Sequence, residues 1–93
     1  MHLLLPVLLT TTESTGKPSR FVALSSCAAA KTAMMTNEDP FIDFDDLNWE
    51  KREYNESVAY SQSKLSNYLH ALGASMKYPS DKLISTSVHP GWV

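Results

Sequence analysis

Residues 57–91 read SVAYSQSKLSNYLHALGASMKYPSDKLISTSVHPG, and this stretch decides the fold. Its first part predicts a helix over residues 57–76, because leucine and tyrosine side chains recur there at intervals of three and four. These side chains are Leu65, Tyr68, Leu69 and Leu72. Gly73 weakens the far end of this helix, since glycine costs backbone entropy in a helix interior.

Two strands are predicted, one on either side of that helix. Residues 83–89 are rich in β-branched side chains, which favour a strand, and Pro90 and Gly91 end it. Residues 20–25 form a short, mostly apolar run between turn residues, which is typical of a buried strand. A strand, a crossover helix and a second strand imply a parallel pair in an α/β sheet, joined by a right-handed connection.

The flanking segments give weaker signals. Residues 1 to about 12 read as the end of an apolar helix packed in a core, and the polar residues 10–19, which contain glycine and proline, read as a surface loop. The apolar run at residues 3–9 is too short to span a bilayer. It also matches a signal peptide poorly, because His2 makes a weak basic region and no cleavage site follows closely. Residues 37–50 are acidic and aromatic, and we expect an irregular excursion there.

The composition is that of a globular protein with one domain at most. The 93 residues are 43% apolar and 19% charged, unlike a disordered chain. The net charge is −2 and the basic residues do not cluster, which argues against nucleic acid as a partner because phosphate binding needs a basic footprint. Cys27 is the only cysteine, so neither an intramolecular disulfide nor a cysteine-based metal site is expected.

Tyr60 and Lys64 are the first candidates for chemistry. They lie four residues apart on the predicted helix and therefore share one face, one turn apart. Free tyrosine is a poor base at neutral pH, and a neighbouring ammonium makes it a usable acid/base by stabilising the phenolate. A tyrosine and a lysine at this spacing are more often a solvated helix face, so the pair alone does not indicate catalysis.

Further polar residues are expected beside this pair. Ser25 and Ser26 close the first predicted strand, and Pro90 and Gly91 close the second. Because ligands bind beyond the carboxyl ends of parallel strands in α/β sheets, all of these residues should meet at one rim. The simpler interpretations are a cap or turn for Ser26 and plain turn chemistry for the Pro-Gly pair. The joint order of the motifs is nevertheless hard to obtain by chance.

Together these motifs resemble the short-chain dehydrogenase/reductase family. The matching stretches are residues 20–26 (RFVALSS), 60–67 (YSQSKLSN) and 88–91 (VHPG). Residues 43–49 (DFDDLNW) and the long gap between Ser26 and Tyr60 look like the retinol-dehydrogenase-like branch of this family. The resemblance implies a doubly wound parallel sheet of Rossmann type, of which residues 1–93 would be a partial NAD(P)-binding domain.

The resemblance also implies roles for the candidate residues. Tyr60 would be the general acid/base, Lys64 would assist it and hydrogen-bond the cofactor's ribose, and Ser26 would hold and polarise the substrate oxygen. The nicotinamide end would be lined by Pro90, Gly91 and Val93, and Tyr60 would also contact the cofactor. The cofactor would be NAD or NADP, with NADP favoured, and the substrate a carbonyl/alcohol pair, with lipid-like compounds among the candidates. The cytoplasm is the favoured compartment, with membrane association of the parent enzyme as the alternative.

One part of the family pattern is missing from these 93 residues. The family opens with a glycine-rich turn and a helix whose N-terminus holds the pyrophosphate, whereas the glycines here are Gly16, Gly73 and Gly91. We therefore expect a fragment of a gene model or a truncated product that lacks the N-terminal βαβ half and is inactive by itself. The alternative is a non-catalytic remnant that acts, if at all, through protein contacts.

No metal site is expected. The carboxylates between residues 38 and 50 lack the glycine and the ligand order of an EF-hand loop, so we expect a solvated acidic loop that apolar side chains pin to the body. These side chains are Phe41, Phe44, Leu47 and Trp49. The histidines, His2, His70 and His89, are too scattered for a metal site. Cys27 reads as a small buried residue rather than a reactive thiol.

Overall fold

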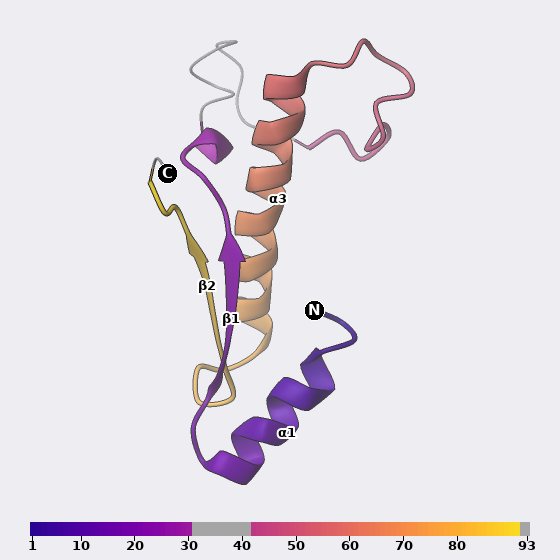
Figure 1. Cartoon of the computed structure of the whole chain (residues 1–93). Helices are drawn as coiled ribbons and strands as arrows, with labels where there is room; N and C mark the ends of the chain where they lie inside the picture. The colour runs from indigo at the N-terminus through magenta and orange to yellow at the C-terminus, as the bar shows by residue number, and fades with distance from the viewer. Residues whose placement is uncertain (31–41, 92–93) are drawn as a thin grey trace.

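A computed structural model of the chain describes residues 1–30 and 42–91 (Figure 1). The elements follow in the order α1 (Leu5–Thr15), β1 (Ser19–Leu24), α3 (Glu56–Lys77) and β2 (Leu83–Val88). The predicted order of helix, strand, excursion, helix and strand is therefore confirmed. The bounds of α3 and both strands agree with the predicted ones to within one residue.

The two strands form a parallel pair, as the sequence predicts. Their register runs from Ser19 opposite Leu83 to Leu24 opposite Val88. In Figure 1 both strand arrows point the same way, and α3 runs back alongside them in the opposite direction. The α/β class is thus confirmed. The right-handed crossover and the doubly wound Rossmann-type sheet stay predictions, because the part of the chain that the structure describes contains one strand pair.

Helix α3 packs on one face of this pair. The ring of His70 on α3 lies 5.0 Å from the ring of Phe21 on β1. The Ser85 hydroxyl on β2 donates a hydrogen bond of 2.9 Å to the carbonyl of Ala71 on α3. The buried apolar side chains sit between these elements and are Ala23, Ala71, Ala74 and Leu83. This small core fixes α3, and with it Tyr60, against the sheet.

Helix α1 is longer than predicted, because it extends through the threonine-rich segment to Thr15. The expected loop over residues 10–19 is therefore wrong for its first six residues. The hydroxyls of Thr11 and Thr15 each donate to the carbonyl four residues earlier, both at 2.8 Å. Such back-bonding lets threonine satisfy its hydroxyl inside a helix. Gly16 ends the helix with φ of 70°, a conformation that glycine adopts at little cost.

The expectation that the first residues pack in a core is also wrong. Leu3, Leu4 and Val7 are 87%, 64% and 62% exposed. Helix α1 is instead attached by a buried hydroxyl, because Thr12 Oγ1 donates to the Lys82 carbonyl at 2.7 Å and accepts from the Ser19 amide at 2.9 Å. No helix within the described residues is long and apolar enough to cross a membrane.

The Thr12 contact leads to a prediction about stability. Thr12→Val should lower the free energy of unfolding by about 1–3 kcal/mol, because it leaves a part-buried carbonyl and amide without their partner. Thr10→Val is the matched control, since Thr10 is exposed on the same helix. Urea unfolding of the two variants and of the unsubstituted protein, each made as the longest natural polypeptide that contains residues 1–93, measures the difference. Equal stability of the two variants would remove Thr12 from this role.

Candidate active site

A cavity of about 320 Å³ opens at the rim where both strands end. Its walls come from the residues after β1, from one face of α3 and from the residues after β2. The predicted site residues that line it are Ser26, Tyr60, Lys64, Pro90 and Gly91. The remaining one, Val93, lies outside the described residues. The strand pairing continues to this rim, because the Ser25 amide donates to the Val88 carbonyl at 2.8 Å.

Tyr60 and Lys64 lie side by side on the wall formed by α3. The Lys64 ammonium is 5.4 Å from the centroid of the Tyr60 ring and donates to the Leu24 carbonyl at 3.4 Å. Tyr60 is 52% exposed, so a ligand in the cavity can reach its hydroxyl. The pair therefore presents a phenol and a cation to the same space.

Two further side chains fix α3 against the end of β1. Asn67 donates through Nδ2 to the Leu24 carbonyl at 2.9 Å, the carbonyl that Lys64 also contacts. The Ser25 hydroxyl donates to the main-chain carbonyl of Lys64 at 2.7 Å. From the sequence, Ser25 is expected at this rim without a role of its own, and Asn67 is not assigned to catalysis. The signal that could have indicated Asn67 is its place about one turn beyond Lys64 on the same helix face.

Ser26 has two uses that do not exclude each other. Its hydroxyl oxygen accepts a hydrogen bond of 3.2 Å from the Ala28 amide, which fits the turn interpretation. A hydroxyl that accepts one bond still carries its own proton as a donor. Ser26 is half-buried in the wall of the cavity. It can therefore stabilise the turn after β1 and donate to an oxygen of a bound ligand.

The remaining wall residues include Cys27 and His89. Cys27 is exposed, which corrects the expectation of a small buried residue. His89, the last residue of the second predicted strand, also lines the cavity and is exposed. Gly91 has φ of 88°, a left-handed conformation that strains other residues. This turn lets the main chain after Pro90 border the cavity.

The chain is similar to retinol dehydrogenase 13 from two mammals. It is 38% identical to the protein of Homo sapiens and 34% identical to that of Mus musculus, in each case over 90 residues. The match covers 97% of this chain. The chain is related to the retinol dehydrogenases.

This relationship confirms the resemblance to short-chain dehydrogenases and supports oxidoreductase chemistry in the parent family. The chain spans about a quarter of the length of these relatives, 25% in each case. No protein-family model matches it, and no solved structure matches it significantly.

The cavity at the strand ends offers several polar groups to a ligand. Lys64 offers an ammonium whose one described hydrogen bond is long, at 3.4 Å, and Tyr60 offers a hydroxyl. The main chain around Gly91 borders the same space. These groups suit a ribose and a carboxamide. The 93 residues hold no glycine-rich turn for the pyrophosphate, because Gly16, Gly73 and Gly91 are far apart in the sequence.

A second, wider cavity adjoins the first. It measures about 690 Å³ and shares Ala28 and Tyr60 with the first cavity. Tyr54 and Ala59 add an aromatic and an apolar side chain to its wall. Tyr60 therefore stands between two spaces, one bordered by the strand ends and one bordered by the segment that precedes α3.

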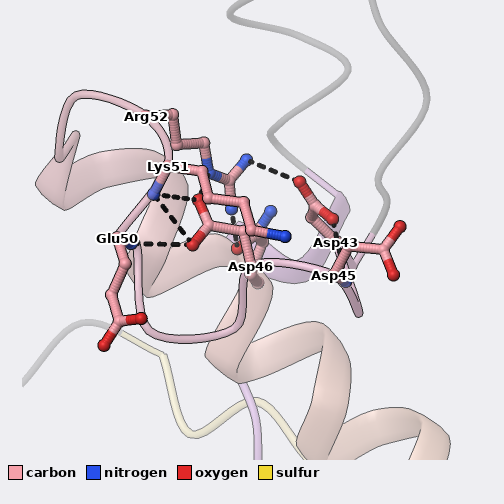
Figure 2. A network of polar contacts seen from close by, with 7 residues as sticks. Asp43, Asp45, Asp46, Glu50, Lys51 and Arg52 are labelled. Carbon is pink, nitrogen blue, oxygen red and sulfur yellow. Dashed lines mark hydrogen bonds and ion pairs between the residues drawn. The ribbon is translucent and has the colours of Figure 1, made fainter.

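The segment before α3 is an acidic turn, residues 43–52, with a buried centre (Figure 2). Asp46 is buried and accepts hydrogen bonds from the amides of Glu50 at 2.7 Å and Lys51 at 3.2 Å. The expectation of a solvated loop is therefore wrong for Asp46. Phe44 and Leu47 are 78% and 62% exposed, so neither pins the turn to the body.

The predictions for Glu38, Asp39 and Phe41 concern residues that lie outside the described ones. Across residues 1–30 and 42–91, no three histidine, cysteine or acidic side chains lie close enough together to hold a metal ion.

Proposed function

We propose that this chain supplies the acid/base centre of a nicotinamide-dependent oxidoreductase that interconverts an alcohol and a carbonyl compound. The observation that carries the proposal is that Ser26, Tyr60 and Lys64 line one cavity at the carboxyl rim of a parallel strand pair. Residues 1–93 would then be part of an NAD(P)-binding domain of Rossmann type. The names of the relatives favour a retinol-like substrate, which is an apolar alcohol or aldehyde.

The side chains would divide the reaction between them. A bound nicotinamide cofactor supplies or accepts hydride at the substrate carbon. Tyr60 gives its hydroxyl proton to the carbonyl oxygen during reduction and takes it back from the alcohol during oxidation. Ser26 donates a hydrogen bond to the same oxygen, which fixes its position and polarises the carbonyl. Lys64 stabilises the phenolate that Tyr60 becomes after giving up its proton.

Other residues would hold the cofactor. Lys64 would also bind the ribose hydroxyls, and Pro90, Gly91 and Val93 would border the nicotinamide end through the main chain. We favour NADP over NAD from the family resemblance alone. Asn67 bonds the end of β1, and Ser25 bonds the main chain of α3. These bonds would keep the site residues in place before a ligand binds, so that less entropy is lost when the substrate and cofactor are oriented.

A non-catalytic remnant is the competing function. The 93 residues hold no glycine-rich turn, and a remnant would act only through protein contacts. The two proposals differ in a direct assay on the longest natural polypeptide that contains residues 1–93, called the full-length protein below. An oxidoreductase oxidises NADPH or NADH in the presence of retinaldehyde, which absorbance at 340 nm detects. A remnant leaves both cofactors unchanged, and this outcome would refute the proposed function.

Lys64 gives a specific prediction within this function. Lys64→Met in the full-length protein should lower kcat/KM by about 10²-fold, because it removes both the cation beside Tyr60 and a donor to the ribose. Lys77→Met is the control, since Lys77 lies at the far end of the same helix. Steady-state kinetics with varied cofactor measure both changes. If the two variants behave alike, Lys64 has no part in the reaction.

A further inference from the structure

We propose that Arg52 is a positioning residue, which holds Tyr54 as a wall of the wider cavity beside Tyr60, where the apolar part of the substrate binds. The inference rests on the proposed function, since it concerns the substrate of the same site. It goes beyond that function by naming the residue that shapes the substrate side. No contact of Arg52 with the reacting atoms is involved.

Arg52 is the last residue of the acidic turn and pairs with its buried carboxylate. Its Nε lies 3.5 Å from Oδ2 of Asp46 (Figure 2). Its guanidinium carbon lies 3.7 Å from the centroid of the Trp49 ring. The planar guanidinium can stack on an aromatic face and pair with a carboxylate at the same time, which a lysine ammonium cannot do in the same way. Arg52 therefore joins the buried carboxylate to the indole.

Arg52 also ties the turn to the helix that carries Tyr60. Its Nη2 donates to Oε1 of Gln62 at 3.3 Å. Gln62 is buried two residues after Tyr60, and its Nε2 is buried without a hydrogen-bond partner among the described residues. Among the described residues, the bond from Arg52 is thus the one hydrogen bond that the Gln62 carboxamide makes. A change at Arg52 therefore removes a hydrogen bond to a buried side chain of α3, the helix that also carries Tyr60.

Trp49 transmits this restraint to Tyr54. The two rings meet edge to face, with centroids 5.5 Å apart and an angle of 73°. Trp49 has φ of 57°, which a residue with a side chain adopts only when its surroundings hold it there. The guanidinium of Arg52 lies over the indole of this residue and restrains the ring. Contacts therefore run without a break from Gln62 through Arg52 and Trp49 to Tyr54.

The chemistry of the wall indicates what it binds. Tyr54 is 64% exposed and faces the wider cavity together with Ala59 and Tyr60. Glu56 and serine hydroxyls make up the more polar part of the wall. An aromatic ring next to the acid/base group suits a long apolar chain attached to the reacting carbon. A short aldehyde would not reach Tyr54.

The test compares a long and a short substrate in the full-length protein, using decanal and propanal with NADPH. In Arg52→Met, KM for decanal should rise about tenfold, because the wall that orients the chain is loosened. KM for propanal and kcat for either aldehyde should stay within about twofold of the parent, since the acid/base residues are unchanged. Lys51→Met is the matched control, because it removes the neighbouring positive charge but none of the side-chain contacts of Arg52.

The other possible outcomes contradict either the positioning role of Arg52 or the proposed function. The deciding quantity is the ratio of KM for decanal to KM for propanal. If this ratio is the same in Arg52→Met as in the unsubstituted protein, including when both KM values rise equally, the positioning role is overturned. If circular dichroism shows that Arg52→Met does not fold, Arg52→Lys takes its place, because it keeps the charge but loses the planar stack, and the same KM ratio decides. If the unsubstituted protein reduces none of decanal, propanal and retinaldehyde, the proposed function is refuted instead. The two failures are therefore distinguishable.

Discussion

Tyr60→Phe in the full-length protein is expected to lower kcat by about 10²–10⁴-fold, the range by which a positioned acid/base accelerates proton transfer. Phenylalanine keeps the ring beside Lys64 but removes the hydroxyl that would protonate the carbonyl oxygen. Because the ring remains, the shape of both cavities that Tyr60 lines is kept. Cofactor binding should therefore be largely intact.

Tyr68→Phe is the matched control for this variant. Tyr68 lies on the same helix and is 44% exposed, close to the 52% of Tyr60, but it does not line the cavity at the strand ends. Its loss of a hydroxyl should leave kcat unchanged within about twofold. Stopped-flow and steady-state assays with NADPH and retinaldehyde give both rates. Near-normal turnover by Tyr60→Phe would remove Tyr60 from the acid/base role.

A polypeptide of the 93 residues alone is expected to show no saturable binding of NADH or NADPH at micromolar concentrations. Nicotinamide cofactors are held largely through pyrophosphate contacts at a glycine-rich turn and helix N-terminus, and these 93 residues hold no such turn. The cavity of about 320 Å³ could contact only the ribose and nicotinamide end. If the cofactor is not held tightly, the nicotinamide and the substrate carbon also lose the mutual orientation that supplies much of the rate of hydride transfer.

The same polypeptide is expected to aggregate or to order only in part. Val22, Leu24 and Val88 on the strands are 56%, 53% and 38% exposed, and parallel sheets are normally covered on both faces. A two-stranded sheet also leaves edges that can pair with other chains. Fluorescence titration and thermal melting of the 93 residues, with the full-length protein as positive control, test both expectations. Micromolar binding with turnover of an aldehyde would contradict them.

The central part of the fold could be predicted because its signals are local. The helix Glu56–Lys77 follows from apolar spacing, and the strand Leu83–Val88 from β-branched residues between turns. The parallel pairing then follows from the order of these elements. The convergence of Ser26, Tyr60 and Lys64 on one rim could be expected for the same reason, since the carboxyl ends of parallel strands share an edge.

Other features depend on contacts between distant residues, which no local pattern reveals. Thr12 is buried because it bonds the carbonyl of Lys82, 70 residues away. Asp46 is buried because its carboxylate accepts bonds from two amides of its own turn and pairs with Arg52, whereas acidic composition indicates only solvation. The exposure of Leu3 could not be read from its hydrophobicity, because hydrophobicity does not say what lies opposite.

The most direct test of the proposed acid/base centre follows hydride itself. The full-length protein is incubated with retinaldehyde and NADPH that carries deuterium at both hydrogen positions of C4 of the nicotinamide, and the alcohol is analysed by mass spectrometry. We predict that one deuterium appears on the carbinol carbon, that Tyr68→Phe transfers it at the parent rate, and that Tyr60→Phe transfers it about 10²–10⁴-fold more slowly. Alcohol without deuterium, no alcohol at all, or equal transfer by the two variants would contradict the account.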